Sequence, residues 1–242
     1  KKKGSIMTHY EFQGRSLPDY DVQGAKKVYF SPYADNGGSV IALAGDDFSI
    51  IAADTRLSAG FSIYTRDQQK LFPLSKTTVL GCSGCWCDTL TLTRILSARM
   101  QMYNHEHQKD MSTPATAQML STVLYYKRFF PYFISNVLAG LDENGKGCIY
   151  SYDPIGHCER SMYRAGGSAG ALLQPLLDNQ IGYKNQEGSQ DRPPLTKERA
   201  LAIIKDVFIS AAERDIYTGD GISIKIITKA GIVDDSFALR KD

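Results

Sequence analysis

The sequence predicts an α+β fold in which two mainly antiparallel β-sheets lie between two pairs of helices. The expected elements run in the order sheet, two helices, sheet, two helices, sheet. That order lacks the regular strand–helix alternation of a doubly wound parallel sheet. Of the 242 residues, 43% are apolar, which is enough to supply a sizeable core. Stacking the sheets face to face, with a helix pair on each outer side, buries every apolar face.

The N-terminal part of the chain is expected to be an extended leader over residues 1–35. This stretch has mixed polarity and no sustained period, and glycines and prolines interrupt it repeatedly. From residue 36 to residue 242 no composition shift or linker divides the chain. We therefore expect one domain over residues 36–242.

A hairpin opens this domain. Two apolar runs, 40–44 and 48–53, flank a Gly45-Asp46-Asp47 turn, as expected for paired strands with a covered face. The second run leads into Asp54, Thr55 and Arg56, which places a carboxylate, a hydroxyl and a guanidinium where a strand leaves the core. Such strand ends are common positions for site residues. Further strands are expected over residues 61–65, 70–74 and 77–82.

Two helices follow, and their start signals are clear. Asp88 is expected to cap a run with apolar residues at helical spacing as far as residue 104. Ser112-Thr113-Pro114 combines a cap with a proline just inside the helix, which we expect to continue to residue 128. Their neighbouring amphipathic faces predict a helical hairpin layer.

The second half repeats this pattern. Phe129-Phe130-Pro131 ends the second helix, and Asp142-Glu143-Asn144-Gly145 is a turn signal between two strand patterns. The expected strands are 132–141, 147–152 and 157–165, followed by a helix over 166–178, a polar loop over 179–195 and a helix over 196–213. A turn over 215–221 then precedes a final hairpin over 222–228 and 232–237.

Charge and cysteine content exclude several classes of function. The net charge of +2 is small and dispersed, which argues against nucleic acid or a membrane surface as the main partner. The sequence contains no apolar run of about 18 residues that could span a bilayer. Five cysteines, an odd number without framework spacing, predict reduced thiols in an intracellular protein.

Two short patterns have residue types that occur in metal or redox sites. Cys82, Cys85 and Cys87 lack a second cysteine or histidine pair at zinc spacing, so a strand end with a turn is favoured. His105-Glu106-His107 is interpreted as the solvated end of a helix. We therefore predict no metal and no cofactor.

Several stretches carry a resemblance to a known family. They are FSPY, GFSIYTRD, RFFPYF, GLDENGKG, AGGSAGALLQPLLDNQ and VFISAAERDIYTGD. With the element order, they make residues 36–242 similar to the beta subunits of the 20S proteasome, most of all to a non-catalytic subunit at the sixth position of the beta ring. The resemblance implies the four-layer alpha-beta-beta-alpha sandwich of N-terminal-nucleophile hydrolases.

The resemblance also assigns site positions. Active family members attack a peptide carbonyl with the hydroxyl of an N-terminal threonine, whose own amine is the general base. Counting without gaps places the nucleophile position on Gly38. The retained family positions are Asp54, Arg56, Lys70, Asp215 and Thr218, whereas the family's serine before the third helix falls on Gly167, which has no hydroxyl.

A glycine at the nucleophile position implies a non-catalytic subunit, because no side chain is left to attack. Asp54 and Lys70 are then interpreted as a structural ion pair. One alternative is an active peptidase that uses Ser39 after cleavage at Gly38. Strand alternation argues against it, because a shift of one residue turns Ser39 to the opposite face. An independent small-molecule amidohydrolase of the same fold is a third hypothesis.

Partners and location follow from the resemblance. It implies assembly with other beta subunits of the same and the opposite ring and with alpha-ring subunits, in ATP- and ubiquitin-dependent protein degradation in the cytoplasm and nucleus. Asp153, in the Tyr152-Asp153-Pro154 turn, is a candidate contact to a neighbour's substrate channel. Tyr183 and Asn185, in the 179–195 loop, are candidate interface residues.

Overall fold

The computed structural model describes residues 30–184, 187 and 193–242 of the chain. Most of the expected leader over residues 1–35, and the interface candidate Asn185, lie outside the described residues. The chain divides into two units, Lys1–Pro32 and Tyr33–Asp242. The second unit begins just before the expected domain start at residue 36, and it holds all the elements described below.

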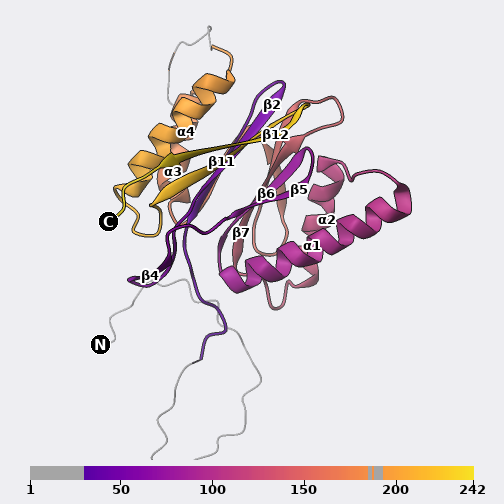
Figure 1. The fold of residues 1–242 in the computed structure, drawn as a ribbon, viewed down its shortest axis with the longest axis horizontal. Helices are drawn as coiled ribbons and strands as arrows, with labels where there is room; N and C mark the ends of the chain where they lie inside the picture. Colours follow the sequence, from indigo (N-terminus) through magenta and orange to yellow (C-terminus); the bar gives the residue numbers. More distant parts are fainter. Residues whose placement is uncertain (1–29, 185–186, 188–192) are drawn as a thin grey trace, which may run out of the picture. The chain divides into compact units, whose positions relative to one another are not determined.

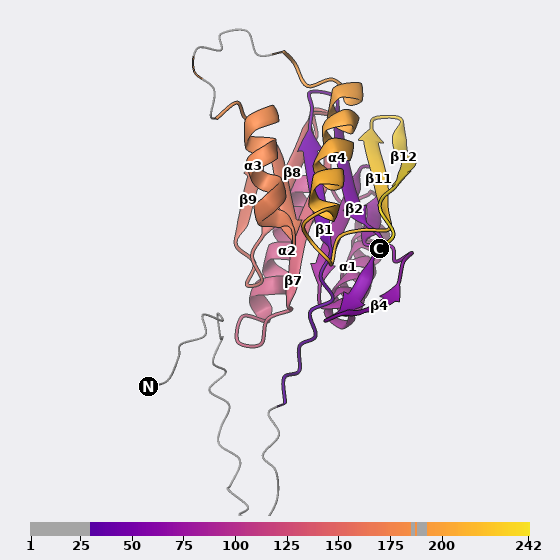
Figure 2. The ribbon, with the colours of Figure 1, turned by 90° about the vertical axis from the view of Figure 1, so that its left-hand side faces the viewer.

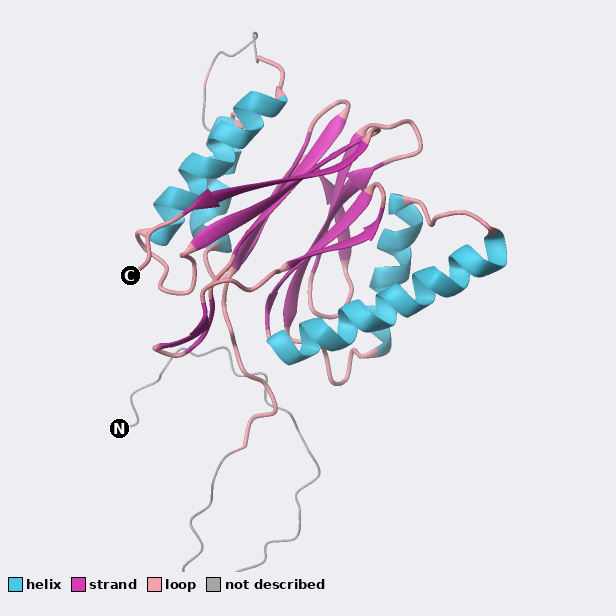
Figure 3. Cartoon of the chain, viewed as in Figure 1, coloured by secondary structure: helices cyan, strands magenta, loops and turns pink. Residues whose placement is uncertain are grey.

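Two five-stranded sheets form the centre of this unit, and a short ribbon extends one end of it (Figure 3). The first sheet has the order β10-β1-β2-β11-β12, with β1 (Ser39–Ala44), β2 (Phe48–Asp54), β10 (Tyr163–Gly167), β11 (Gly221–Thr228) and β12 (Gly231–Ala238). The second has the order β5-β6-β7-β8-β9, with β5 (Leu71–Ser75), β6 (Thr78–Gly84), β7 (Ile134–Leu141), β8 (Gly147–Tyr152) and β9 (Cys158–Ser161). The ribbon pairs β3 (Leu57–Ala59) with β4 (Ser62–Thr65). Every neighbouring pair is antiparallel.

A helix pair covers the outer face of each sheet (Figures 1 and 2). Helices α1 (Trp86–His107) and α2 (Thr113–Tyr126) pack on the second sheet, and α3 (Gly170–Gln180) and α4 (Lys197–Ala212) pack on the first. Helices α2 and α4 begin at expected caps, because Ser112 Oγ and Thr196 Oγ1 accept hydrogen bonds from backbone N–H groups of the first turn. The four-layer sandwich is therefore confirmed.

Strand alternation on β1 separates two apolar layers. Ile41 and Leu43 are fully buried against α3 and α4, while Val40 and Ala42 are fully buried between the sheets. By the same alternation, residue 38 faces the space between the sheets and residue 39 faces the outer helix layer. This register fixes which side chains can meet at the start of β1.

Two element predictions were wrong. The single strand expected over residues 157–165 is two strands in different sheets: β9 pairs with β8, and β10 pairs with β1. The chain crosses between the sheets at Met162, whose carbonyl accepts from the Ala44 N–H at 2.8 Å. Apolar periodicity does not encode the partner strand, so it could not reveal this crossing. The ribbon strand β3 was also missed.

The start of α1 differs from the prediction as well. Asp88 was expected as the cap, but the helix begins at Trp86 after Cys85, whose side chain makes no capping hydrogen bond. Asp88 Oδ2 instead accepts from the Phe133 N–H at 2.9 Å, which fastens the start of β7 to the first turn of α1. No helix within the described ranges is both long and apolar enough to cross a membrane.

Candidate functional site

The site is built around the segment that enters β1. Gly37 and Gly38 have φ angles of +62° and +91°, in the left-handed region that favours glycine. The Gly37 carbonyl accepts from the Gly84 N–H at 3.2 Å, and the Gly38 carbonyl accepts from the Ser168 N–H at 2.9 Å. Backbone hydrogen bonds to β6 and to the turn before α3 therefore hold this buried segment in place.

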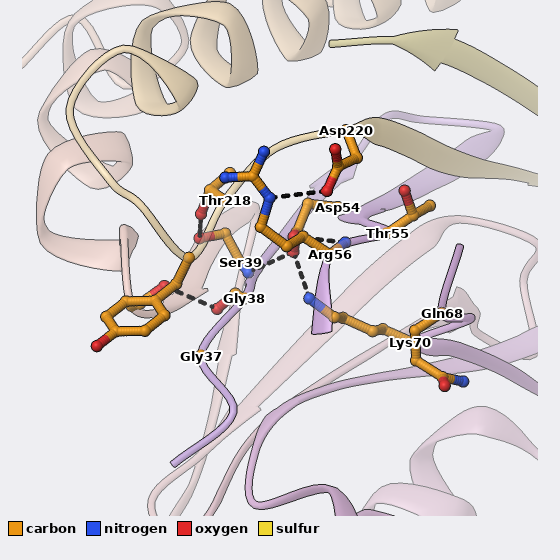
Figure 4. A network of polar contacts seen from close by, with 12 residues as sticks. Gly37, Gly38, Ser39, Asp54, Thr55, Arg56, Gln68, Lys70, Thr218 and Asp220 are labelled. Carbon is orange, nitrogen blue, oxygen red and sulfur yellow. Dashed lines mark hydrogen bonds and ion pairs between the residues drawn. The ribbon is translucent and has the colours of Figure 1, made fainter. Parts of the chain in front are cut away.

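Asp54 and Lys70 form a buried ion pair beside Gly38 (Figure 4). Lys70 Nζ lies 2.8 Å from Asp54 Oδ1, and the two side chains are 2% and 0% exposed. The carboxylate also accepts from the Ser39 N–H at 2.8 Å and the Arg56 N–H at 3.1 Å. Burial raises the pKa of the Asp54 carboxyl, and Lys70 with these two N–H groups opposes that rise.

The Lys70 ammonium occupies the space next to the Gly38 Cα. A Cβ built on Gly38 would overlap Lys70 Nζ and would lie 2.9 Å from Lys70 Cε and 3.1 Å from Asp54 Oδ1. The first two contacts are closer than carbon atoms in folded proteins allow. A side chain at residue 38 would therefore require the end of the Lys70 side chain to move, and it would also have to adopt a left-handed backbone.

Ser39 points away from Lys70 into a second polar cluster, on the other face of β1. Its Oγ lies 2.7 Å from Thr218 Oγ1 and accepts from the Ala169 N–H at 3.2 Å. The Thr218 hydroxyl donates to Asp215 Oδ2 at 2.7 Å, so the single Ser39 hydroxyl proton is directed at Thr218. Ser39 itself is fully buried.

Ser168 supplies a hydroxyl to the site that the sequence-based prediction did not name. Gly167 has no side chain, but the hydroxyl of the next residue, Ser168, donates to Asp215 Oδ2 at 2.6 Å, and its Oγ also lies 3.3 Å from the Gly38 carbonyl oxygen. Gly167 has a φ of +91°, and a Cβ there would overlap the Gly38 carbonyl oxygen. The site therefore has a hydroxyl on the residue that follows Gly167. The Gly166-Gly167-Ser168 sequence was the available signal.

Arg56 belongs to a separate cluster, although it follows Asp54 closely in the sequence. Its Nε donates to Asp220 Oδ2 at 2.7 Å, and its guanidinium also donates to the carbonyls of Ile216 and Asp242. Arg66 forms a second ion pair with Asp220. Burial acts to raise the pKa of Asp220, but the hydrogen bonds from Arg56 and Arg66 outweigh it and lower that pKa. Sequence reasoning missed Asp220, whose only signal was its place between Gly219 and Gly221.

Comparison with known proteins identifies the family of this chain. A family model described as "Proteasome subunit" matches residues 34–227. The chain belongs to the proteasome subunit family. It is 61% identical over 227 residues to "Proteasome subunit beta type-1" of Drosophila melanogaster, covering 93% of this chain and 97% of that protein. The protein of the same name from Arabidopsis thaliana is 47% identical over 216 residues, covering 88% and 97%.

This proteasome core subunit has the N-terminal-nucleophile hydrolase fold without a side chain at the position that faces Lys70. The hydroxyls of the neighbouring residues Ser39 and Ser168 are both engaged in hydrogen bonds. Within residues 30–184, 187 and 193–242, no group of three or more histidine, cysteine or acidic side chains is arranged to hold a metal ion.

The interface candidates of this proteasome subunit have contacts within the chain. Asp153 Oδ1 accepts from the N–H groups of Ile155 at 3.1 Å and His157 at 2.7 Å, which shapes the β8–β9 turn. The Tyr183 hydroxyl accepts from Arg199 at 2.6 Å, and the Arg199 guanidinium lies over the Tyr183 ring. These contacts give both residues a structural role, and their proposed contacts to neighbours stay predictions.

Proposed function

We propose that this chain is a non-catalytic subunit that completes the beta ring of the 20S proteasome core and helps to enclose its proteolytic chamber. The observation that carries the proposal is Gly38, which lies beside the Lys70 ammonium and has no side chain that could attack a peptide bond. Its φ of +91° also disfavours any residue that has a side chain.

The charged residues around Gly38 have a structural role in this proposal. Asp54 accepts from Lys70 Nζ and from two backbone N–H groups, so removal of either charged partner would leave an uncompensated charge in a buried place. In a catalytic subunit the same groups would act on a nucleophile. Here they join the entry of β1 to the end of β2 and the start of β5.

A second candidate has one observation in its favour. Ser39, Thr218 and Asp215 form a chain of hydrogen bonds that ends on a carboxylate, an arrangement that can polarise a hydroxyl. Cleavage between Gly38 and Ser39 would then make Ser39 an N-terminal nucleophile. Full burial of Ser39 and its position on the face opposite Lys70 weigh against this candidate.

An electrophilic probe for N-terminal threonine and serine separates these candidates. The purified particle is treated with the probe, and each subunit is weighed by mass spectrometry. The proposal expects labelling of other beta subunits and no adduct on this chain. An adduct on Ser39 would support the peptidase candidate, and hydrolysis of small amides by the free monomer would support the amidohydrolase hypothesis.

The cellular setting is part of the same proposal. By similarity to the beta type-1 subunits, the partners are beta subunits of both rings and alpha-ring subunits. The pathway is ATP- and ubiquitin-dependent degradation, in the cytoplasm and nucleus. Native mass measurement of the particle that contains this chain, together with imaging of the tagged chain, tests these points. Recovery of the chain only as a free monomer would contradict them.

A further inference from the structure

We propose that the turn at the end of α2 is a docking surface for an acidic segment of a neighbouring proteasome subunit, and that a carboxylate of this segment binds Arg128. We call Tyr125, Tyr126, Lys127, Arg128 and Phe129 the aromatic turn. The inference rests on the proposed function, because it names the contact by which this chain would join its neighbour. In the complex, the apolar side chains of the aromatic turn surround the carboxylate of the partner.

The aromatic turn exposes large apolar side chains. Tyr126 and Phe129 are 84% and 82% exposed, and Tyr125 is 54% exposed. Contiguous exposed aromatic side chains mark interaction sites, because each can bury about 150–250 Å² on contact. Tyrosine and arginine together are also typical of the residues that dominate binding energy in protein interfaces. This composition favours a protein partner.

Arg128 is already positioned for a carboxylate. Its guanidinium carbon lies 5.1 Å from the centre of the Tyr125 ring and 5.0 Å from the centre of the Phe129 ring. Its Nη1 donates to the Tyr125 hydroxyl at 2.6 Å, which fixes the plane of the group. A guanidinium has five N–H donors, so donors are left for a bidentate contact.

The charge of this surface lacks a counterpart within the described part of the chain. No described carboxylate lies within 4.0 Å of the Arg128 or Lys127 side-chain nitrogens. Two adjacent positive charges among aromatic rings therefore call for negative charge on the partner. Charge complementarity of this kind fixes partner choice and register.

The backbone of the aromatic turn is held in place before binding. The N–H groups of Lys127, Arg128 and Phe130 donate to carbonyls three residues earlier, at 3.0, 3.0 and 2.9 Å. Ser121 Oγ donates to the Gly156 carbonyl at 2.6 Å, which joins α2 to the β8–β9 turn. Because the turn is already ordered, docking has less conformational entropy to remove.

The adjoining surface already receives an aromatic side chain from an extended segment. The Tyr33 ring packs on Phe130 and Phe133, with ring centres 5.5 and 5.7 Å apart, and its hydroxyl donates to the Pro131 carbonyl at 2.7 Å. This contact lies directly beside the aromatic turn in the sequence. It shows how a segment can be held on aromatic rings with one polar contact.

Cross-linking in the intact particle identifies the partner. A photoreactive phenylalanine replaces Tyr126, and the matched control replaces Met102, which is 70% exposed on α1. We expect the Tyr126 probe to cross-link one other subunit at a segment that contains aspartate or glutamate, and the Met102 probe not to do so. A cross-link to a second copy of this chain, to a segment without carboxylates, or to no subunit would overturn the proposal.

Competition for incorporation tests the charge. Wild-type chain and Arg128→Glu carry different tags, are expressed together, and are compared by their ratio in purified particles. We expect the variant to be under-represented about tenfold or more, as for loss of a dominant interface residue. Arg94→Glu, an exposed arginine on α1 with no ion pair in the described structure, should incorporate at nearly the wild-type level.

Charge exchange completes the test. Changing the cross-linked carboxylate of the partner to arginine should restore incorporation of Arg128→Glu. Equal incorporation of wild-type and Arg128→Glu chains would overturn this inference and leave the proposed function intact. Absence of the wild-type chain from every particle would instead contradict the proposed function itself, so the two failures are distinguishable.

Discussion

Lys70 Nζ lies so close to Gly38 that a Cβ on residue 38 would overlap it, and a 2.8 Å contact to Asp54 Oδ1 holds the ammonium there. A side chain at residue 38 would therefore have to displace the end of Lys70 from its buried partner Asp54. Each prediction below tests a part of this arrangement.

Gly38→Thr should destabilise the subunit without creating a reactive nucleophile. The threonine Cβ would overlap Lys70 Nζ, and the left-handed backbone adds about 1–2 kcal/mol for a residue with a side chain. Gly60→Thr is the matched control, because Gly60 also has a positive φ, of +56°, but has no neighbouring atom within 4 Å of its Cβ position. Urea denaturation should show a clearly larger loss for Gly38→Thr. An equal loss of stability in both variants would show that Lys70 does not hinder a side chain at residue 38.

Lys70→Met should lower the free energy of unfolding by about 3–5 kcal/mol, because it leaves the Asp54 charge buried and unpaired. Lys70→Met combined with Asp54→Asn should recover part of this loss, because the neutral amide keeps an acceptor for the backbone N–H groups. The exposed Lys146–Asp46 pair, 3.7 Å apart, provides the control. Lys146→Met should change stability by less than about 1 kcal/mol. A double variant as unstable as the single one would contradict the paired-charge account.

Stability should depend on Asp220 at acid pH. Its pKa is lowered in the folded state, so the unfolded chain takes up the proton first as the pH falls. The stabilisation is complete above the unfolded pKa, about 4, and is lost as the pH falls through the folded pKa. Urea titrations of wild type and Asp220→Asn should differ most near neutral pH and converge in acid. A difference that stays constant with pH would contradict this prediction.

Ser39→Ala should destabilise the subunit without changing the peptidase activities of the particle. The Ala169 N–H loses its acceptor in a buried place, which costs about 1–3 kcal/mol. Thermal unfolding measures the first effect, and hydrolysis of fluorogenic peptides by the assembled particle measures the second. Loss of one peptidase activity in otherwise intact particles would show that Ser39 takes part in catalysis.

Asp153 variants separate turn formation from a charge effect on a neighbour. Asp153→Asn keeps an acceptor oxygen for the Ile155 and His157 N–H groups, whereas Asp153→Ala removes it. If the carboxylate shapes a neighbour's substrate channel, as we predict, both variants should alter the same peptidase activity of the particle. Unchanged peptidase activities in particles with Asp153→Asn would show that Asp153 acts only in forming the turn.

Much of the fold could be predicted from local patterns. The Gly45-Asp46-Asp47 hairpin and the starts of α2 and α4 follow from residue types that have a defined backbone or capping role. The crossing at Met162 could not be predicted, because the residue pattern of 157–165 is that of a single strand and does not indicate which sheet each part joins. Strand partners are long-range contacts, and apolar period carries no information about them.

The candidate site was predicted unevenly for a similar reason. The resemblance placed Asp54 and Lys70 in one site, and the structure joins them. It placed the family's serine before α3 on Gly167 and predicted no hydroxyl there, and it did not name Ser168, which follows the left-handed Gly167 and reaches Asp215. Arg56 lies two residues after Asp54, but its side chain points to Asp220, because the direction of a side chain after a strand end depends on tertiary contacts. Counting positions along the sequence cannot predict those contacts.

The most direct test of the central claim is the mass of this chain in intact particles before and after treatment with a probe for N-terminal nucleophiles. The account predicts an unbroken Gly38–Ser39 peptide bond and no probe adduct on this chain, while other beta subunits are labelled. A chain that begins at Ser39 and carries the probe would contradict it.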